Sequence, residues 1–258
     1  QYKEIPCRVI PSLSGKSVVE INELIKYILE FKPDIIHSHL FEAEIVSRWN
    51  ILPNIKYFTH CHDNMPQLRR FKLSDIFYKK RLTELFERWL LLKRYKTCHN
   101  QFITISNDTK VFLEQNIGNT LKKNIILMHN AINCNRFQVD RVETEKLYLV
   151  NVGSFVPKKN QKFFIPLAKD LIKKGLDFKI ALLGDGPLRN DFIAEMKINK
   201  LEKYFELPGN VNNVEDYYAK SKIYIHAALY EPFGLVLHEA MAAGLPVICL
   251  DGKGNRDI

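Results

Sequence analysis

Short apolar runs alternate with longer amphipathic stretches along most of the chain. Runs such as 125–128 are continuously apolar, which is typical of parallel strands that helices cover on both faces. The runs that predict strands are 34–38, 55–59, 102–106, 125–129, 147–152, 178–183, 204–207, 223–227 and 246–250. The stretches that predict helices are 20–31, 41–49, 74–96, 108–115, 161–174, 188–199, 214–220 and 234–243. This repeated strand–helix order predicts an α/β fold with parallel sheets.

A polar stretch at 133–146 interrupts this order and predicts a linker. It divides the chain into an N-terminal domain at 1–140 and a C-terminal domain at 141–258, two Rossmann-like units in tandem. Sheets of this kind bind ligands beyond the carboxyl ends of their strands. The chemistry of the protein is therefore expected in the loops that follow the strands.

The composition is that of an ordinary globular protein, with 258 residues, 46% hydrophobic and 26% charged. No apolar run approaches the ~18 residues of a membrane-spanning helix, and the first residues lack the basic and apolar regions of a signal peptide. The five cysteines are scattered, without metal-ligand spacing, which favours a reducing compartment. These features together predict a cytoplasmic protein.

The formal charge of +9 favours anionic partners: nucleic acid, acidic lipid or phosphorylated small molecules. The helix expected at 74–96 combines an apolar stripe with many cations. This suits peripheral contact with an anionic membrane at the inner face of the plasma membrane, although a solvated basic face explains the pattern equally well. The chain lacks a helix-turn-helix, a zinc finger or a basic motif interleaved with aromatics, so no nucleic-acid partner is expected.

The strongest local pattern for chemistry lies at 230–246. A helix is expected to open near Gly234, where the missing side chain lets an anion approach the first backbone N–H groups. Glu239 follows about one turn later and can hold the hydroxyl groups of a sugar, whereas Glu231 lies in the preceding loop. The alternative is that both glutamates are ordinary surface acids. The glycine and proline residues that frame the pair favour a ligand site.

Residues 231–239 resemble the Glu-x7-Glu signature of the retaining glycosyltransferases of family 4, which share the GT-B fold of two Rossmann-like domains. The other segments similar to that family's strand-end loops are 35–39, 59–63, 103–106, 129–133, 152–160, 183–187 and 207–211. The resemblance therefore covers most of the chain. It also implies a further strand before residue 1 and closing strands and helices after residue 258. Both domains are accordingly expected to be incomplete. This chain is therefore expected to be less active than a longer protein with both domains complete, or inactive.

The resemblance assigns donor-binding roles to individual residues. Glu239 is expected to bind the donor ribose, Glu231 to contact the donor sugar near the reacting centre, and Lys159 to stabilise charge on the departing diphosphate. The positions expected to bind the donor are Gly153, Lys159, Gly184, Val211, Phe233, Gly234, Leu235 and Glu239. Ser154 stands where the family often has arginine, so one cation of the family's site is missing here. Either the charge of Lys158 or an uncharged contact to the donor is expected to replace it.

His62 and the aspartate after it resemble the family's His-Asp segment, so His62 is expected to contact the donor sugar or the acceptor, as a third catalytic residue beside Glu231 and Lys159. The alternative is a structural histidine in a local hydrogen-bond network. His37 and His39 are interpreted as strand-end structure. No Asp-x-Asp pair follows a strand, in agreement with a family that usually needs no metal, and no metal ligands are expected.

The expected activity is the transfer of a hexosyl unit, with retention at the anomeric carbon, from a UDP- or GDP-type sugar to a hydroxyl group. The acceptor is expected to be a saccharide or a lipid-linked molecule in bacterial surface polysaccharide or glycolipid synthesis, and no cofactor is expected beyond the donor substrate. A sugar-nucleotide epimerase or a phosphorylase of the same architecture is one alternative. A non-catalytic basic protein that binds nucleic acid or membranes is another. An epimerase needs no acceptor, so incubation with the donor alone distinguishes it.

Overall fold

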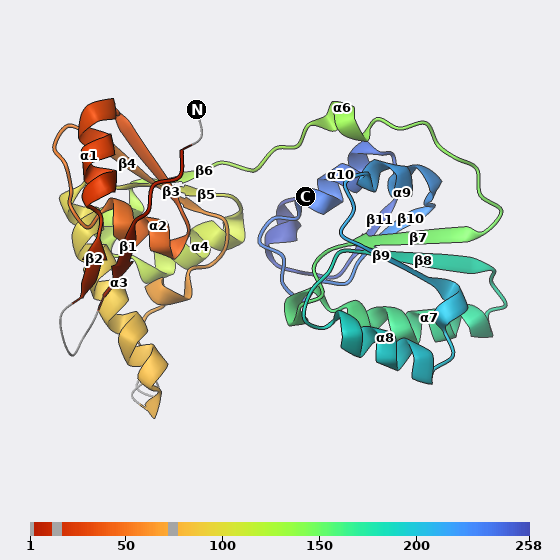
Figure 1. Cartoon of the computed structure of the whole chain (residues 1–258). Helices are drawn as coiled ribbons and strands as arrows, with labels where there is room; N and C mark the ends of the chain where they lie inside the picture. Colours follow the sequence, from red (N-terminus) through yellow and green to blue (C-terminus); the bar gives the residue numbers. More distant parts are fainter. Residues whose placement is uncertain (1–2, 12–16, 72–76) are drawn as a thin grey trace. The chain divides into compact units, whose positions relative to one another are not determined.

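The structure is a computed structural model that describes residues 3–11, 17–71 and 77–258 (Figure 1). The chain divides into two compact units, residues 1–129 and 130–258, here called unit 1 and unit 2. The boundary expected after residue 140 lies further along the chain than this division. The reason is that helix α6 (Cys134–Phe137), inside the expected linker, belongs to unit 2: Phe137 is buried there among core side chains of unit 2.

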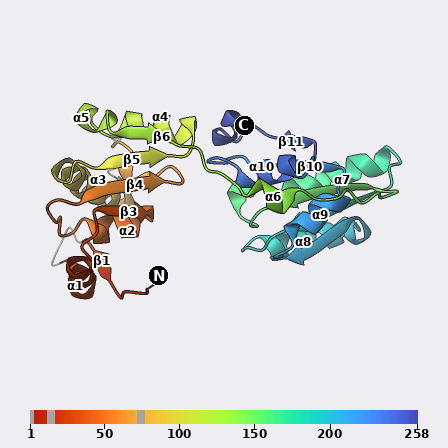
Figure 2. The same ribbon diagram turned by 90° about the horizontal axis from the view of Figure 1, so that it is seen from above.

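A four-stranded parallel sheet forms the centre of unit 1, in the order β3-β4-β5-β6 (Figure 2). Its strands are β3 (Ile35–His39), β4 (Lys56–Cys61), β5 (Gln101–Thr104) and β6 (Ile125–Leu127). All four were predicted, with ends that differ by up to two residues. The register of β3 and β4 places His37 beside Phe58 and His39 beside His60.

The helices of unit 1 are α1 (Asn22–Phe31), α2 (Leu40–Ser47), α3 (Lys79–Thr97), α4 (Asn107–Asn116), α5 (Asn119–Lys122) and a short 3-10 turn, η1 (Pro66–Leu68). An antiparallel pair of three-residue strands, β1 (Arg8–Ile10) and β2 (Val18–Glu20), was not predicted. Glu20, expected to begin a helix, instead pairs with Arg8 in this ladder. Part of the basic helix predicted at 74–96 lies outside the described residues.

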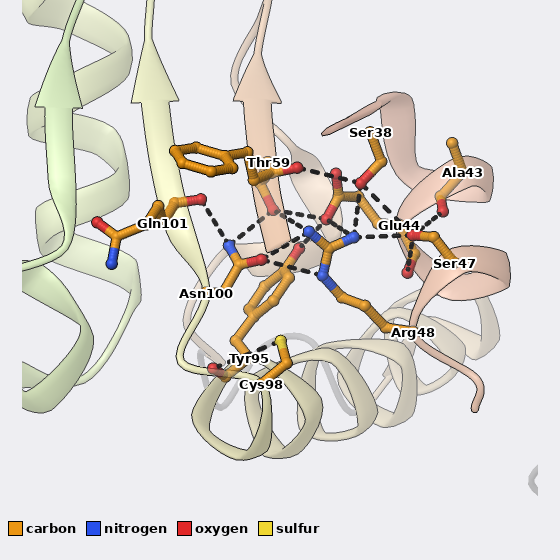
Figure 3. Close-up of polar contacts among 11 residues, drawn as sticks. Ser38, Ala43, Glu44, Ser47, Arg48, Thr59, Tyr95, Cys98, Asn100 and Gln101 are labelled. Atoms are coloured by element: carbon orange, nitrogen blue, oxygen red, sulfur yellow. Dashed lines mark hydrogen bonds and ion pairs between the residues drawn. The ribbon is translucent and has the colours of Figure 1, made fainter. Parts of the chain in front are cut away.

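A buried polar network connects β3, β4 and α2 beneath the unit 1 sheet (Figure 3). Arg48 is fully buried and lies 3.0 Å from the carboxylate of Glu44, also fully buried. Its guanidinium donates to Ser38 Oγ at 2.6 Å, to Asn100 Oδ1 at 2.6 Å and to Thr59 Oγ1 at 3.2 Å. Burial raises the pKa of Glu44, against the opposing effect of the Arg48 charge. The network holds the middle of β3 and β4 in place from one face of the sheet.

A five-stranded parallel sheet forms the centre of unit 2, in the order β11-β10-β7-β8-β9. Its strands are β7 (Leu147–Val152), β8 (Phe178–Leu183), β9 (Phe205–Gly209), β10 (Ile223–His226) and β11 (Val247–Cys249). The strands predicted at 147–152 and 178–183 match the structure in both bounds. The doubly wound arrangement expected from the sequence is present.

Helices cover both faces of the unit 2 sheet (Figure 1). The helical elements are α6 (Cys134–Phe137), α7 (Phe164–Lys173), α8 (Arg189–Ile198), α9 (Val214–Lys220), α10 (Leu235–Ala242) and the 3-10 turns η3 (Pro157–Lys159), η4 (Gln161–Phe163), η5 (Glu202–Tyr204) and η6 (Gly254–Asp257). One buried cluster includes side chains of α7 and α8, and a second includes side chains of α6, α9 and α10. Within residues 3–11, 17–71 and 77–258, no helix combines the length and apolar character that crossing a bilayer requires.

Candidate active site

Three glycines bring the strand-end loops of unit 2 into close contact at one edge of the sheet. Gly153 follows β7, Gly184 follows β8 and Gly209 ends β9. The amide of Gly184 donates to the carbonyl of Gly209 at 2.8 Å. Gly184 has φ +126°, and a Cβ atom there would lie 2.4 Å from the carbonyl oxygen of Gly153. Glycine at 184 is therefore required for loop packing, and the two predicted donor-site glycines, 153 and 184, lie side by side.

Lys159 and Glu231, both predicted from the sequence, form an ion pair at this edge. Lys159 ends the turn η3, and its Nζ donates to Glu231 Oε2 at 2.5 Å. The same oxygen accepts a hydrogen bond from Nε2–H of His226 at 2.8 Å. His226 ends β10 and is 1% exposed, and the hydroxyl of Tyr224 lies 3.3 Å from its Nδ1. The structure thus joins two residues separated by 72 positions into one charged cluster.

Glu231 is 6% exposed, and its environment fixes its charge. Burial alone raises the pKa of this carboxyl group, but the hydrogen bond from His226 and the charge of Lys159 outweigh it and bring the pKa to about 2. Glu231 is therefore an anion at neutral pH and has no proton to donate. Its neighbour His226 was not identified from the sequence, although its place at a strand end, five residues before Glu231, was a usable signal.

The loop that carries Glu231 is held by residues near the end of the chain. The amide of Glu231 donates to the carbonyl of Gly252 at 2.8 Å, and Asn255 Oδ1 accepts from the amide of Gly252 at 2.8 Å. A Cβ atom at Gly254 would lie 2.0 Å from the carbonyl oxygen of Pro232. The segment 252–255 therefore fixes the backbone position of Glu231, a contact that the sequence did not predict.

Helix α10 begins directly after this loop, as expected. Gly234 precedes it with φ +98°, a left-handed conformation that suits glycine, and a Cβ atom there would lie 2.8 Å from Leu237 Cδ1. Local packing thus already requires glycine at this position, in addition to the close ligand approach that was expected. Phe233 is buried and stacks on His238 with ring centroids 4.8 Å apart, whereas Leu235 is 39% exposed.

Glu239 lies one turn into α10 and is half-buried. Its Oε2 accepts a hydrogen bond from the hydroxyl of Tyr218 at 3.3 Å, and burial raises its pKa. Val211, predicted near the donor base, packs against the same apolar cluster that contains Tyr218. Two predicted donor residues thus share one neighbourhood, and Tyr218 is an additional member that the sequence pattern did not reveal.

His62 lies in unit 1, just after β4, and is not an isolated histidine. Its Nε2 is 2.6 Å from Nδ1 of His39, and its ring stacks on His60 with centroids 4.2 Å apart. His60 in turn stacks on His37 at 5.3 Å. His60 and His62 also line a pocket of 330 Å³ that includes Glu42. The register of β3 with β4 brings these four histidines together, which no motif in the sequence indicated.

Comparison with known protein families agrees with this geometry. A model described as "Glycosyltransferase Family 4" matches residues 3–136, and one described as "Glycosyl transferases group 1" matches residues 134–258. The chain belongs to glycosyltransferase family 4. The resemblance inferred from the motifs is thereby confirmed, and the two matches meet near the division between the two units.

Relatives of this family 4 chain include two transferases, one bacterial and one from a plant. An N-acetylgalactosamine-N,N'-diacetylbacillosaminyl-diphospho-undecaprenol 4-alpha-N-acetylgalactosaminyltransferase of Campylobacter jejuni is 28% identical over 189 residues, which cover 72% of this chain and 50% of that protein. The sulfoquinovosyl transferase SQD2 of Arabidopsis thaliana is 24% identical, covering 100% of this chain and 48% of its own length. The chain spans about half the length of these relatives.

Among solved structures, HepE of Anabaena in complex with UDP and glucose is similar to this chain, with a TM-score of 0.70 and 17% identity. The similarity covers 91% of this chain and 64% of HepE. At this identity the likeness shows the fold, and the predicted class of tandem Rossmann-like units of GT-B type is confirmed.

Proposed function

We propose that this chain carries the donor-binding machinery of a retaining glycosyltransferase that moves a hexosyl unit from a nucleoside diphosphate sugar to an acceptor hydroxyl. Membership in family 4 supports the reaction class. The observation that supports the site is the Lys159–Glu231–His226 cluster beyond the carboxyl ends of the strands, where Rossmann-like sheets bind nucleotides. The site is proposed to work without a metal ion.

In this proposal the positive charges face the part of the donor that becomes negative. Lys159 Nζ stabilises the charge that grows on the departing diphosphate, and the N-terminus of α10 adds backbone N–H groups near Leu235. The C–O bond between the anomeric carbon and the β-phosphate breaks while the acceptor oxygen bonds to the same face of that carbon. The acceptor proton passes to the β-phosphate, because Glu231, with a pKa of about 2 and an oxygen already bonded to Lys159 and His226, is too weak a base to take it.

Glu231 is proposed to orient Lys159 and to contact the donor sugar, and Glu239 to accept hydrogen bonds from the ribose hydroxyl groups. The Tyr218 hydroxyl on one oxygen of Glu239 fixes the direction of that carboxylate. Gly153, Gly184 and Val211 complete the donor positions. His62 is the proposed contribution of unit 1 to sugar or acceptor binding.

The relatives favour particular substrates within this class. HepE was solved with UDP and glucose, which favours a UDP-type donor over a GDP-type donor here. The Campylobacter relative is named for an undecaprenol-linked acceptor, which favours a lipid-linked acceptor. The basic helix α3 exposes Trp89 at 57%, and Phe77 just before it is 86% exposed, which supports peripheral contact with an anionic membrane from the cytoplasmic side.

The test is binding followed by product analysis. UDP- and GDP-sugars are titrated into the protein by calorimetry, and the best donor is then incubated with and without a lipid-linked saccharide acceptor. The expected result is a heavier acceptor that carries one hexosyl unit, with the same anomeric configuration as the donor by NMR. Conversion of the donor alone into an epimer, or an inverted product, contradicts the proposal.

A further inference from the structure

Four histidines of unit 1 lie on one face of two paired strands. Successive side chains of a strand alternate between the two faces of a sheet, so His37 and His39 share one face of β3. His60 sits directly beside His39 on β4, and His62 follows two positions later. Ser38, between His37 and His39, and Thr59, just before His60, point to the other face, where Arg48 donates a hydrogen bond to each (Figure 3). The four histidines thus lie on the face of β3 and β4 that is opposite the Arg48 network.

The ring nitrogens of this group are close enough to share one ion. One nitrogen each of His37, His39 and His60 lies within 4.8 Å of the other two. In a tetrahedral zinc site, a Zn–N distance of about 2.0–2.1 Å separates the ligand nitrogens by ~3.3 Å. The His37 and His60 rings stack nearly parallel, so they must turn about their side-chain torsions to bring three nitrogens onto one ion. His37 and His39 are exposed, so an ion can reach them from solvent.

The histidine at the centre of the group has no hydrogen-bond partner. Nδ1 and Nε2 of His60 are both buried without one, an uncommon condition for ring nitrogens that a bound ion would relieve at one of them. Neither ring nitrogen of His60 is committed to a protein group, so the unprotonated one can present its lone pair to an ion.

We propose that His37, His39 and His60 form a binding site for one divalent transition-metal ion of the zinc type, with His62 as the positioning residue of His39. When Nδ1–H of His39 donates to Nε2 of His62, the other nitrogen of His39 keeps its lone pair for the ion. Hydrogen bonds of this kind commonly orient metal-binding histidines. His62 takes part in both proposals, but the metal-binding test does not depend on transferase activity.

The donor set also selects the class of ion. Three imidazoles and no carboxylate suit Zn²⁺, Co²⁺, Ni²⁺ or Cu²⁺ rather than Mg²⁺ or Mn²⁺. Cys61 lies between His60 and His62 in sequence, but it is buried and, by strand alternation, lies on the face of β4 opposite His60. It is therefore not part of the donor set. The ion proposed here is thus a transition-metal ion and not a hard cation.

The test uses the whole chain without a polyhistidine tag. Zn²⁺ is titrated by calorimetry, and Co²⁺ binding is followed by visible absorption. One equivalent of each ion is expected, with the intense visible bands of a tetrahedral cobalt site and without a thiolate-to-cobalt charge-transfer band. The doubly substituted variant His37→Ala/His60→Ala is expected to lose at least 100-fold in affinity, and His62→Ala ~10–100-fold as a lost supporting contact.

The matched control is His99→Asn, which removes another imidazole of unit 1 at a position with φ +49°, a conformation that asparagine tolerates. It should bind zinc like the unchanged protein. Equal binding by all variants, or a charge-transfer band of sulfur, overturns the proposal. If the doubly substituted variant does not fold by circular dichroism, X-ray absorption of the zinc-loaded unchanged protein decides. Three imidazole ligands support the site, and sulfur or mainly water ligands overturn it.

Discussion

The two units differ in whether the ionisable side chains at the ends of their strands have hydrogen-bond partners. In unit 2, Glu231 binds both Lys159 and His226, so its charge and direction are set before a ligand arrives. In unit 1, both ring nitrogens of His60 are buried without a hydrogen-bond partner. One strand-end edge thus has charges that are already paired and fixed in direction, as the proposed donor site requires, whereas the other has ring nitrogens without a hydrogen-bond partner.

The buried support beneath the unit 1 strands should carry the largest single effect. Arg48→Met leaves the Glu44 carboxylate buried without its cation. We expect the free energy of unfolding to fall by about 3–5 kcal/mol, the usual cost of breaking a buried ion pair. Trp49 and Trp89, the two tryptophans of the chain, both lie in unit 1, so tryptophan fluorescence during urea unfolding reports on this unit. Replacing both partners, as Glu44→Leu/Arg48→Met, should recover most of the loss. A shift below about 1 kcal/mol in the single variant would contradict the role of the network.

In unit 2, the Lys159 ammonium should matter mainly for turnover. Lys159→Met is expected to lower the transfer rate by about 10²–10³-fold, because a preorganised charge at the leaving group is lost. The matched control is Lys162→Met, three residues later, whose ion pair with Glu195 is exposed. Kinetic assays with a nucleotide sugar and an acceptor measure both. Similar rates in the two variants would remove Lys159 from the mechanism, and the fluorescence transition of unit 1 should not change in either.

The lowered pKa of Glu231 predicts an acid-dependent stability of unit 2. Its folded-state pKa of about 2 lies below the ordinary glutamate pKa of 4.5, so the contribution to stability is present above about pH 4.5 and is lost as the pH falls toward 2. The difference is on the order of 3 kcal/mol across that window. Urea unfolding followed by circular dichroism at pH 5 and pH 3 should show a steeper loss in the unchanged protein than in Glu231→Gln. Glu195→Gln serves as the control acid, and an equal pH dependence in Glu231→Gln and the unchanged protein refutes the assignment.

The smallest effect is expected at Tyr218. Tyr218→Phe removes one hydrogen bond to Glu239, a contribution of about 0.5–1.5 kcal/mol, so donor affinity should fall by up to about tenfold. Calorimetric titration with the preferred nucleotide sugar measures the change. Tyr204→Phe, whose ring stacks on Phe178 at 4.7 Å, is the control for loss of a tyrosine hydroxyl elsewhere in unit 2. Unchanged affinity in Tyr218→Phe would show that Glu239 needs no orienting partner.

Much of unit 2 could be predicted because its signals are local in sequence. Apolar runs of the right length gave the strands at 147–152 and 178–183, and the glycine before α10 marked where that helix begins. The three-residue strands β1 and β2 were not predicted because so short a run shows little periodicity. Helix α6 was not predicted because its one core residue, Phe137, lies in an otherwise polar stretch.

The sequence by itself determined the α/β class and the family, and it supplied the predicted donor-site residues, since each depends on residue order along one strand and the loop after it. The tertiary structure decided which of these residues touch. Lys159 and Glu231 meet only because β7 and β10 are neighbours in the sheet, and His39 meets His60 only because of the register of β3 with β4. Strand order and register arise from packing across the whole unit, so short motifs do not carry that information.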